Sequence, residues 1–127
     1  MSNKKIIKTP DAPQAVGPYS QAVEAGGFVF VSGQIPIDPR TGSVVQADIN
    51  EQTRLVMENA RKILAVAGCG MSAVVKSTIY LKNMSDFAIV NEVYGSYFTA
   101  DPPARATVEV SRLPKDVLVE MDFIAVK

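Results

Sequence analysis

The chain has 127 residues, which is enough for one domain and too few for two ordinary ones. Hydrophobic residues make up 47% and charged residues 20%, a globular composition that excludes extensive disorder. The 13 basic and 13 acidic side chains cancel, and no run of Lys or Arg provides the electrostatic footprint of a nucleic-acid-binding protein. We therefore expect a single domain over residues 1–127 with no membrane partner, and the charge balance disfavours a nucleic-acid partner without excluding it.

The amino terminus and the apolar runs decide the expected compartment. Met1 to Lys5 is polar and is followed by only two apolar residues, Ile6 and Ile7, so no signal peptide is expected. No apolar run approaches the roughly 20 residues that cross a bilayer. The single cysteine, Cys69, fits a reducing compartment. These features favour a cytoplasmic location.

The first third of the chain predicts strands. A short strand over residues 6–9 precedes two further strands, 21–25 and 28–32, and the Gly26-Gly27 pair between them is a hairpin signal. Prolines and a glycine predict a loop over residues 33–43.

Two amphipathic helices are expected next. The first begins with a capping box, Asp48 and Glu51, and ends at Gly68. The second is expected to be capped by Ser85 and to end before Pro102. Their apolar faces comprise Val56, Ala60, Ile63 and Ala67 in the first helix and Phe87, Val90, Tyr94 and Phe98 in the second.

Three more strands, at 74–81, 105–110 and 118–126, complete a ββ(β)αβαββ order. Each strand–helix–strand unit implies a parallel pairing, with both helices on one face of a mixed sheet. The predicted fold is α+β, one sheet with two helices packed on one face.

The second face of this sheet bears on function. In the last two strands, one side is apolar throughout and suits the helices. The other side mixes apolar and charged residues, among them Arg105 and Glu120. Because residues 28–32 are apolar on both sides, we expect another subunit to cover this face, which makes the protein an oligomer.

The chain contains no histidine, which excludes Ser-His and Cys-His nucleophile pairs and a Cys/His zinc site within one chain. Arg105 opens a strand and could bind a carboxylate through its planar fork, although a solvated arginine is the commoner role. Glu120 lies mid-strand between apolar neighbours. It is either a working carboxylate or an interface ion pair with Arg105 or Arg112.

Other candidates are weaker from the residues alone. Tyr19 lies in a Gly-Pro turn, where packing is its usual role, and Gly33 after Ser32 permits close approach to a ligand or ends a strand. Asn91 is expected on the apolar face of the second helix, hydrogen-bonded to a loop. Cys69 has no neighbouring cation and is expected to be dispensable.

Taken together, these segments resemble the RidA branch of the Rid (YjgF-like) family. The matching pieces, nearly end to end, are Ala15-Val16-Gly17-Pro18-Tyr19-Ser20-Gln21-Ala22, Ser32-Gly33-Gln34-Ile35-Pro36, Glu51-Gln52-Thr53, Val74-Val75-Lys76, Asp86-Phe87 with Asn91 and Tyr94, Pro103-Ala104-Arg105, Leu113-Pro114 and Glu120.

The resemblance implies a chorismate-mutase-like homotrimer with an inner barrel of sheets, outer helices and three sites between subunits. It implies a 2-iminobutanoate/2-iminopropanoate deaminase that needs no cofactor or metal and hydrolyses reactive imine and enamine acids released by pyridoxal-phosphate enzymes. Arg105 would bind the substrate carboxylate and Glu120 would position the attacking water. The pocket would be lined by Tyr19, Ser32, Gly33, Asn91 and the main chain at Thr107.

One position departs from the family pattern, because many bacterial members carry Cys where this chain has Thr107. That change puts pocket shape and substrate preference in doubt. Two rival interpretations remain open: a regulatory module that senses a small carboxylate without turnover, and an RNA-active translation inhibitor.

Overall fold

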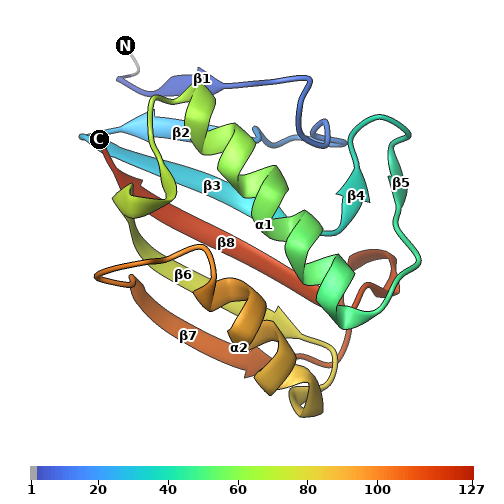
Figure 1. The fold of residues 1–127 in the computed structure, drawn as a ribbon. Coiled ribbons are helices and arrows are strands. Elements are labelled where there is room, and N and C mark those ends of the chain that lie inside the picture. Colours follow the sequence, from blue (N-terminus) through green and yellow to red (C-terminus); the bar gives the residue numbers. More distant parts are fainter. Residues whose placement is uncertain (1–2) are drawn as a thin grey trace.

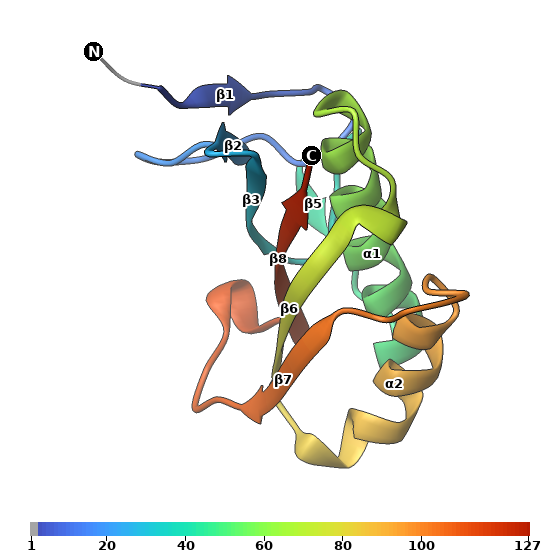
Figure 2. The ribbon, with the colours of Figure 1, turned by 90° about the vertical axis from the view of Figure 1, so that its left-hand side faces the viewer.

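The computed structural model describes residues 3–127. Six strands form one sheet in the order β1-β2-β3-β8-β6-β7, and two helices cover one face of it (Figures 1 and 2). The strands are β1 (Lys5–Ile7), β2 (Ala22–Ala25), β3 (Phe28–Gln34), β6 (Val74–Leu81), β7 (Ala104–Glu109) and β8 (Val119–Val126); the helices are α1 (Ile49–Val66) and α2 (Phe87–Gly95). The predicted α+β fold with both helices on one face is confirmed.

The sheet is mixed, but its order differs from the expectation in one place. Strands β6 and β7 are parallel and are joined through α2, as predicted. The expected pairing of β3 with β6 is wrong, because β8 lies between them and is antiparallel to both. The carboxy-terminal strand thus occupies the centre of the sheet, where both of its edges are hydrogen-bonded.

Local signals explain the limits of α1. The side chain of Asp48 accepts a hydrogen bond from the backbone N–H of Glu51 at 2.9 Å, so the predicted cap is confirmed. At the other end, Gly68 has a φ of 83°, the left-handed conformation in which a glycine closes a helix. The N–H of Gly68 donates to the carbonyl of Ala65, and the next N–H, of Cys69, donates to Leu64, a Schellman motif.

The start of α2 differs from the prediction. Ser85 does not cap the helix; it lies in a single 3₁₀ turn, η2 (Met84–Asp86), and no side-chain cap is present. The carboxylate of Glu109 on β7 accepts the N–H of Met84 at 2.7 Å instead. A contact from a strand distant in sequence therefore takes the place of the local cap.

The β2–β3 hairpin turns at Gly26 and Gly27, both at positive φ, as expected. The predicted loop over 33–43 is partly wrong, because β3 extends to Gln34 and a separate small hairpin forms from β4 (Ile37–Asp38) and β5 (Ser43–Val44). Two-residue strands are too short to leave a periodic pattern in the sequence.

The core lies between the sheet and the helices. In β8 the alternate residues Val119, Met121, Phe123 and Ala125 are buried there, as predicted. The opposite face of the sheet carries large apolar side chains that are open to solvent in one chain: Phe28 is 42% exposed and Phe30 45%. In the part of the chain that the structure describes, no helix is long and apolar enough to cross a membrane.

Candidate functional site

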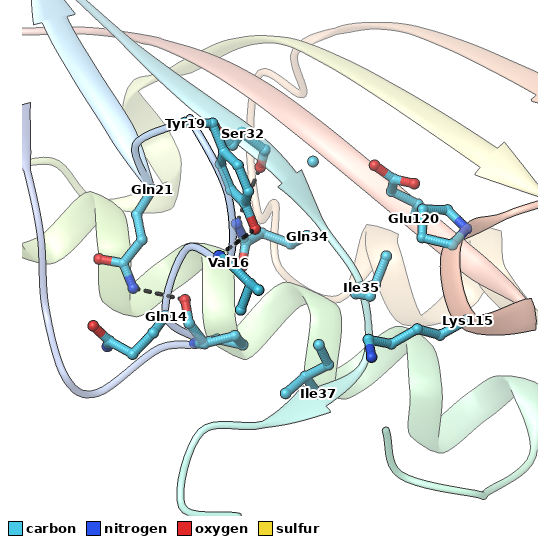
Figure 3. A pocket seen from close by; sticks show the side chains of 13 residues that line it. Gln14, Val16, Tyr19, Gln21, Ser32, Gln34, Ile35, Ile37, Lys115 and Glu120 are labelled. Carbon is cyan, nitrogen blue, oxygen red and sulfur yellow. Dashed lines mark hydrogen bonds between the residues drawn. The ribbon is translucent and has the colours of Figure 1, made fainter. Parts of the chain in front are cut away.

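A cavity of about 590 Å³ opens where β3 ends and β8 begins (Figure 3). Four of the residues singled out in the sequence line it: Tyr19, Ser32, Gly33 and Glu120. The remaining lining residues are Pro13, Gln14, Val16, Gln21, Gln34, Ile35, Ile37, Pro114 and Lys115. A concave, largely apolar space with a few convergent polar groups is the usual form of a small-molecule site.

A β-bulge shapes the wall of this cavity. The pairing of β3 with β8 shifts between Val31 and Gln34, so Ser32 and Gly33 together lie opposite one residue of β8. A Cβ atom built at Gly33 would overlap Oε2 of Glu120. The carboxylate of Glu120 therefore packs directly against the backbone at Gly33, in space that a Cβ atom would occupy. Gly33 is not the plain strand exit that the sequence left open.

Glu120 has the electrostatics of a working carboxylate. It is half-buried, and burial raises its pKa above the usual glutamate value, with the negative charge of Asp122 adding to the effect. Among the described residues, Glu120 has no ion-pair partner, so the alternative of a pair with Arg105 or Arg112 is not realised within one chain. Arg112 pairs instead with Asp116, at 3.0 Å.

The loop that carries Tyr19 is held by a buried glutamine. Gln21 Nε2 donates to the carbonyls of Thr9, Ala12 and Pro13 at 2.8–3.3 Å, and its Oε1 accepts the N–H of Thr9 at 2.7 Å. Gln21 thus ties the preceding loop to β2. Tyr19, at the end of this loop, accepts a hydrogen bond from Val16 N at 3.3 Å through its hydroxyl oxygen, as Figure 3 shows.

Ser32 and Gln34 join the same wall. The Ser32 hydroxyl donates to the carbonyl of Ser20, which fastens the Tyr19 turn to β3. Gln34 donates to the backbone carbonyl of Ser32 at 3.1 Å across the bulge. The hydroxyl proton of Ser32 is therefore used to position the wall of the cavity.

Arg105 lies on the other face of the sheet, against α2. Its Cζ atom is 5.6 Å from the ring centroid of Phe87 and 5.1 Å from that of Tyr94, and its Nη1 donates to Asn91 Oδ1 at 2.8 Å. In the described chain Arg105 has no carboxylate partner. Its guanidinium is thus aimed by two aromatic rings and one amide, with donors left for a ligand.

The expectation that Arg105 and Glu120 share a face of the sheet is wrong for a single chain. Arg105 pairs with Ser77, and Ser77 with Phe123, on the helix-covered side. Glu120 pairs with Tyr80 on the open side. The prediction failed because β7 is an edge strand. Its apolar residues are exposed there, and the rings of α2 accept a cation that an aliphatic core would exclude.

Asn91 and Thr107 accompany Arg105 rather than the cavity. Asn91 is exposed, which corrects the expected buried position on the apolar face of α2 and the expected bond to a loop. Thr107 lies on the same side of β7 as Arg105, and its hydroxyl oxygen is buried without a hydrogen-bond partner. In one chain, the predicted site residues therefore form two separate groups.

Several lining residues were not foreseen. Gln14, Gln34, Ile35, Ile37 and Lys115 come from loops and strand ends whose placement the sequence does not specify. Cys69 is buried in the core, and no group of three or more His, Cys, Asp or Glu residues in the described chain is arranged to hold a metal ion.

The chain is similar to known proteins over nearly its whole length. The family model described as Endoribonuclease L-PSP matches residues 9–127. A RutC family protein of Pyrococcus horikoshii is 57% identical over 98% of both chains. The 2-iminobutanoate/2-iminopropanoate deaminase of Salmonella typhimurium is 48% identical over 97% of this chain and 98% of its own.

Solved structures of similar sequence have the same fold. The crystal structure of Escherichia coli TdcF with bound serine superposes with a TM-score of 0.92 at 46% identity, covering 97% of this chain and 98% of that one. RidA from the Antarctic bacterium Psychrobacter gives a TM-score of 0.93 at 41% identity, covering 97% and 99%.

Fold and cavity define an α+β protein with a small-molecule site beside a half-buried carboxylate. The chain belongs to the Ribonuc_L-PSP family, that of the RutC, YjgF and RidA proteins, which confirms the resemblance found in the sequence.

Proposed function

We propose that the protein hydrolyses small imine and enamine acids, such as 2-iminobutanoate and 2-iminopropanoate, to 2-keto acids and ammonia. The observation that carries the proposal is Glu120, a half-buried carboxylate without an ion-pair partner in the described chain, held against Gly33 at the wall of a ligand-sized cavity. A raised pKa of this kind suits a group that exchanges protons with water.

The site requires a second copy of the chain. The cavity contains no arginine, whereas Arg105 presents unused donors at the edge of the sheet. A homotrimer, in which the apolar open faces pack into a barrel, would bury Phe28 and Phe30 and bring Arg105 of one subunit to Glu120 of the next. Asn91 and Thr107 would enter the site together with Arg105.

The chemistry needs only these groups. Arg105 binds the substrate carboxylate through its planar fork and orients the C=N carbon. Glu120 accepts a proton from water as the oxygen bonds to that carbon and returns it to the nitrogen. The carbinolamine then loses ammonia to give the keto acid. Imines hydrolyse unaided in water, so a modest acceleration is sufficient. An enamine enters the same path after protonation at its terminal carbon.

The relatives support this choice. The Salmonella relative is named as an imine deaminase, and the E. coli TdcF structure holds serine, a small amino acid. Others of similar or higher identity are named only as RutC family proteins. The activity is therefore proposed from the site, and the names agree with it.

The test couples a pyridoxal-phosphate-dependent threonine or serine dehydratase to the protein and traps the remaining imine with semicarbazide. Wild type is expected to speed imine loss. Glu120→Gln keeps the shape of the side chain but lacks the base, so turnover should fall while a stable keto acid still binds. Arg105→Lys lacks the planar fork, so both turnover and binding of the keto acid should weaken. If wild type leaves the rate of imine loss unchanged, the enzyme proposal fails and a carboxylate-sensing role takes its place.

The family description as an endoribonuclease makes RNA the second candidate substrate. The balanced charge of the chain gives no basic stripe for a nucleic-acid backbone, which counts against RNA. Salt-dependent RNA cleavage that Glu120→Gln abolishes, without any imine turnover, would favour this second function.

A further inference from the structure

In one chain, before a second subunit adds its Arg105, the cavity is larger than a small imino acid requires. Its volume of about 590 Å³ lies among pockets that hold drug-sized ligands, about 300–1,000 Å³. Beyond Glu120, the walls are apolar at Ile35 and Ile37, and a cationic group, that of Lys115, borders them. A substrate with a longer side chain and an anionic end would match this extension.

Lys115 supplies the positive charge. It follows Pro114 in the turn η3 (Pro114–Asp116), and Figure 3 shows its side chain extending toward Ile35 and Ile37. Within residues 3–127, no ion pair or hydrogen bond is found for its ammonium group. The carboxylate of this turn, Asp116, is already bound by an arginine, so the charge of Lys115 is not balanced locally.

The backbone of this turn is unusual at Lys115. Lys115 has a φ of 55° and Asp116 a φ of 56°, in the left-handed region that lysine rarely adopts. Strained backbone of this kind is concentrated at ligand sites, where it aims a side chain. Here it holds the Lys115 side chain over the cavity.

Lys115 and Glu120 act on separate parts of the cavity. Burial and Asp122 account for the raised pKa of Glu120. Figure 3 shows the carboxylate of Glu120 and the end of the Lys115 side chain pointing in different directions. The two charges can therefore contact different groups of one ligand.

We propose that Lys115 forms a subsite for a second carboxylate, and that imines of dicarboxylic amino acids with four or five carbons are substrates. This inference rests on the proposed function. Arg105 of a neighbouring subunit takes the first carboxylate and Glu120 directs water to the C=N carbon. The substrate side chain runs past Ile35 to its distal carboxylate at Lys115.

Two stable keto acids of equal chain length test the subsite. 2-Oxoglutarate carries the distal carboxylate and 2-oxopentanoate lacks it. Each is measured as a competitive inhibitor of small-imine turnover and, independently of turnover, as a ligand by calorimetry. A charge-assisted contact predicts that wild type binds 2-oxoglutarate about tenfold more tightly than 2-oxopentanoate, less so at high salt.

Lys115→Met should abolish that preference and leave 2-oxopentanoate binding unchanged. The matched control, Lys82→Met, removes an exposed lysine that does not line the cavity and should keep the preference. Equal binding of the two acids by wild type, or a preference that survives Lys115→Met, overturns the subsite even where small imines are hydrolysed. Absence of imine turnover overturns the proposed function, and the calorimetric ratio then decides the subsite by itself.

Discussion

At the residue scale, the position of the Glu120 carboxylate depends on the absence of a side chain at Gly33. A Cβ atom at Gly33 would overlap the carboxylate of Glu120, although the backbone there does not have a positive φ and would accept alanine. Gly33→Ala should therefore displace Glu120 without unfolding the protein. Because misplacement by about 1 Å can cost a factor of about 100, we expect imine turnover to fall about 10- to 100-fold.

The control for this change is Gly70→Ala, where the nearest atom to an added Cβ would be Ser72 Oγ at 3.8 Å. Both variants should unfold in urea near the wild-type midpoint. If Gly33→Ala keeps the turnover of wild type, the contact between Glu120 and Gly33 is not needed for catalysis.

The pH dependence of the reaction belongs to Glu120 and its neighbour. As a base, Glu120 works only when ionised, and burial together with Asp122 raises its pKa. The acid limb of kcat/KM should thus lie above the ordinary glutamate pKa of about 4.3. Asp122→Asn removes a negative charge and favours the ionised form of Glu120, so the limb should move to lower pH.

A pH–rate profile of both proteins measures this shift. Asp116→Asn, which removes an exposed carboxylate paired with Arg112, serves as the control and should leave the limb in place. A limb that moves to higher pH in Asp122→Asn would contradict the assignment of Glu120 as the base.

At the scale of elements, the Asp48 cap and the hairpin glycines were predicted correctly from local signals, whereas the Ser85 cap and the strand order were wrong. The Asp48 cap and the glycines of the β2–β3 hairpin act through neighbouring backbone, so the sequence specified both. The start of α2 depends on Glu109, a residue 25 positions away from Met84, and no local pattern could reveal it. Insertion of β8 between β3 and β6 is likewise a property of the whole chain.

The loop before β2 depends on one side chain. Gln21 is 3% exposed and makes four hydrogen bonds to the backbone of residues 9–13. Gln21→Ala leaves those buried groups unpaired, which should lower the free energy of unfolding by about 1–3 kcal/mol. Since the same loop carries Tyr19, KM should rise as well.

Urea unfolding and steady-state kinetics test both effects. For stability, Gln14→Ala is the matched control, because the exposed Gln14 donates to two of the same carbonyls, Thr9 and Ala12, where water can replace it. Equal losses of stability in the two variants would argue against Gln21 as the anchor of the loop.

At the scale of the whole molecule, the sequence predicts that another subunit covers the open face of the sheet. The mixed apolar and charged pattern of β8 motivates this prediction, and Phe28 and Phe30 are exposed on that face in one chain. The placement of Arg105 could not be derived in the same way. The alternation of side chains in an edge strand defines its two faces. It does not show which face a short helix with aromatic residues will cover.

The separation of Arg105 from Glu120 leads to the final prediction. Arg105→Ala and Glu120→Gln should each be nearly inactive as pure proteins. When the two are unfolded, mixed in equal amounts and refolded together, an intersubunit site can take Arg105 from one variant and Glu120 from the other. Random assembly gives such a pairing at about a quarter of the sites, so about a quarter of wild-type turnover should return.

A site within one chain would give no recovery, because every chain in the mixture carries one of the two substitutions. Sedimentation equilibrium on wild type supplies the companion measurement, with a trimer mass expected at micromolar concentration. Recovery of turnover with a trimer mass would support both the assembly and the shared site. A monomer mass would exclude them together, because Arg105 and the cavity that holds Glu120 lie on different faces of the sheet in a single chain.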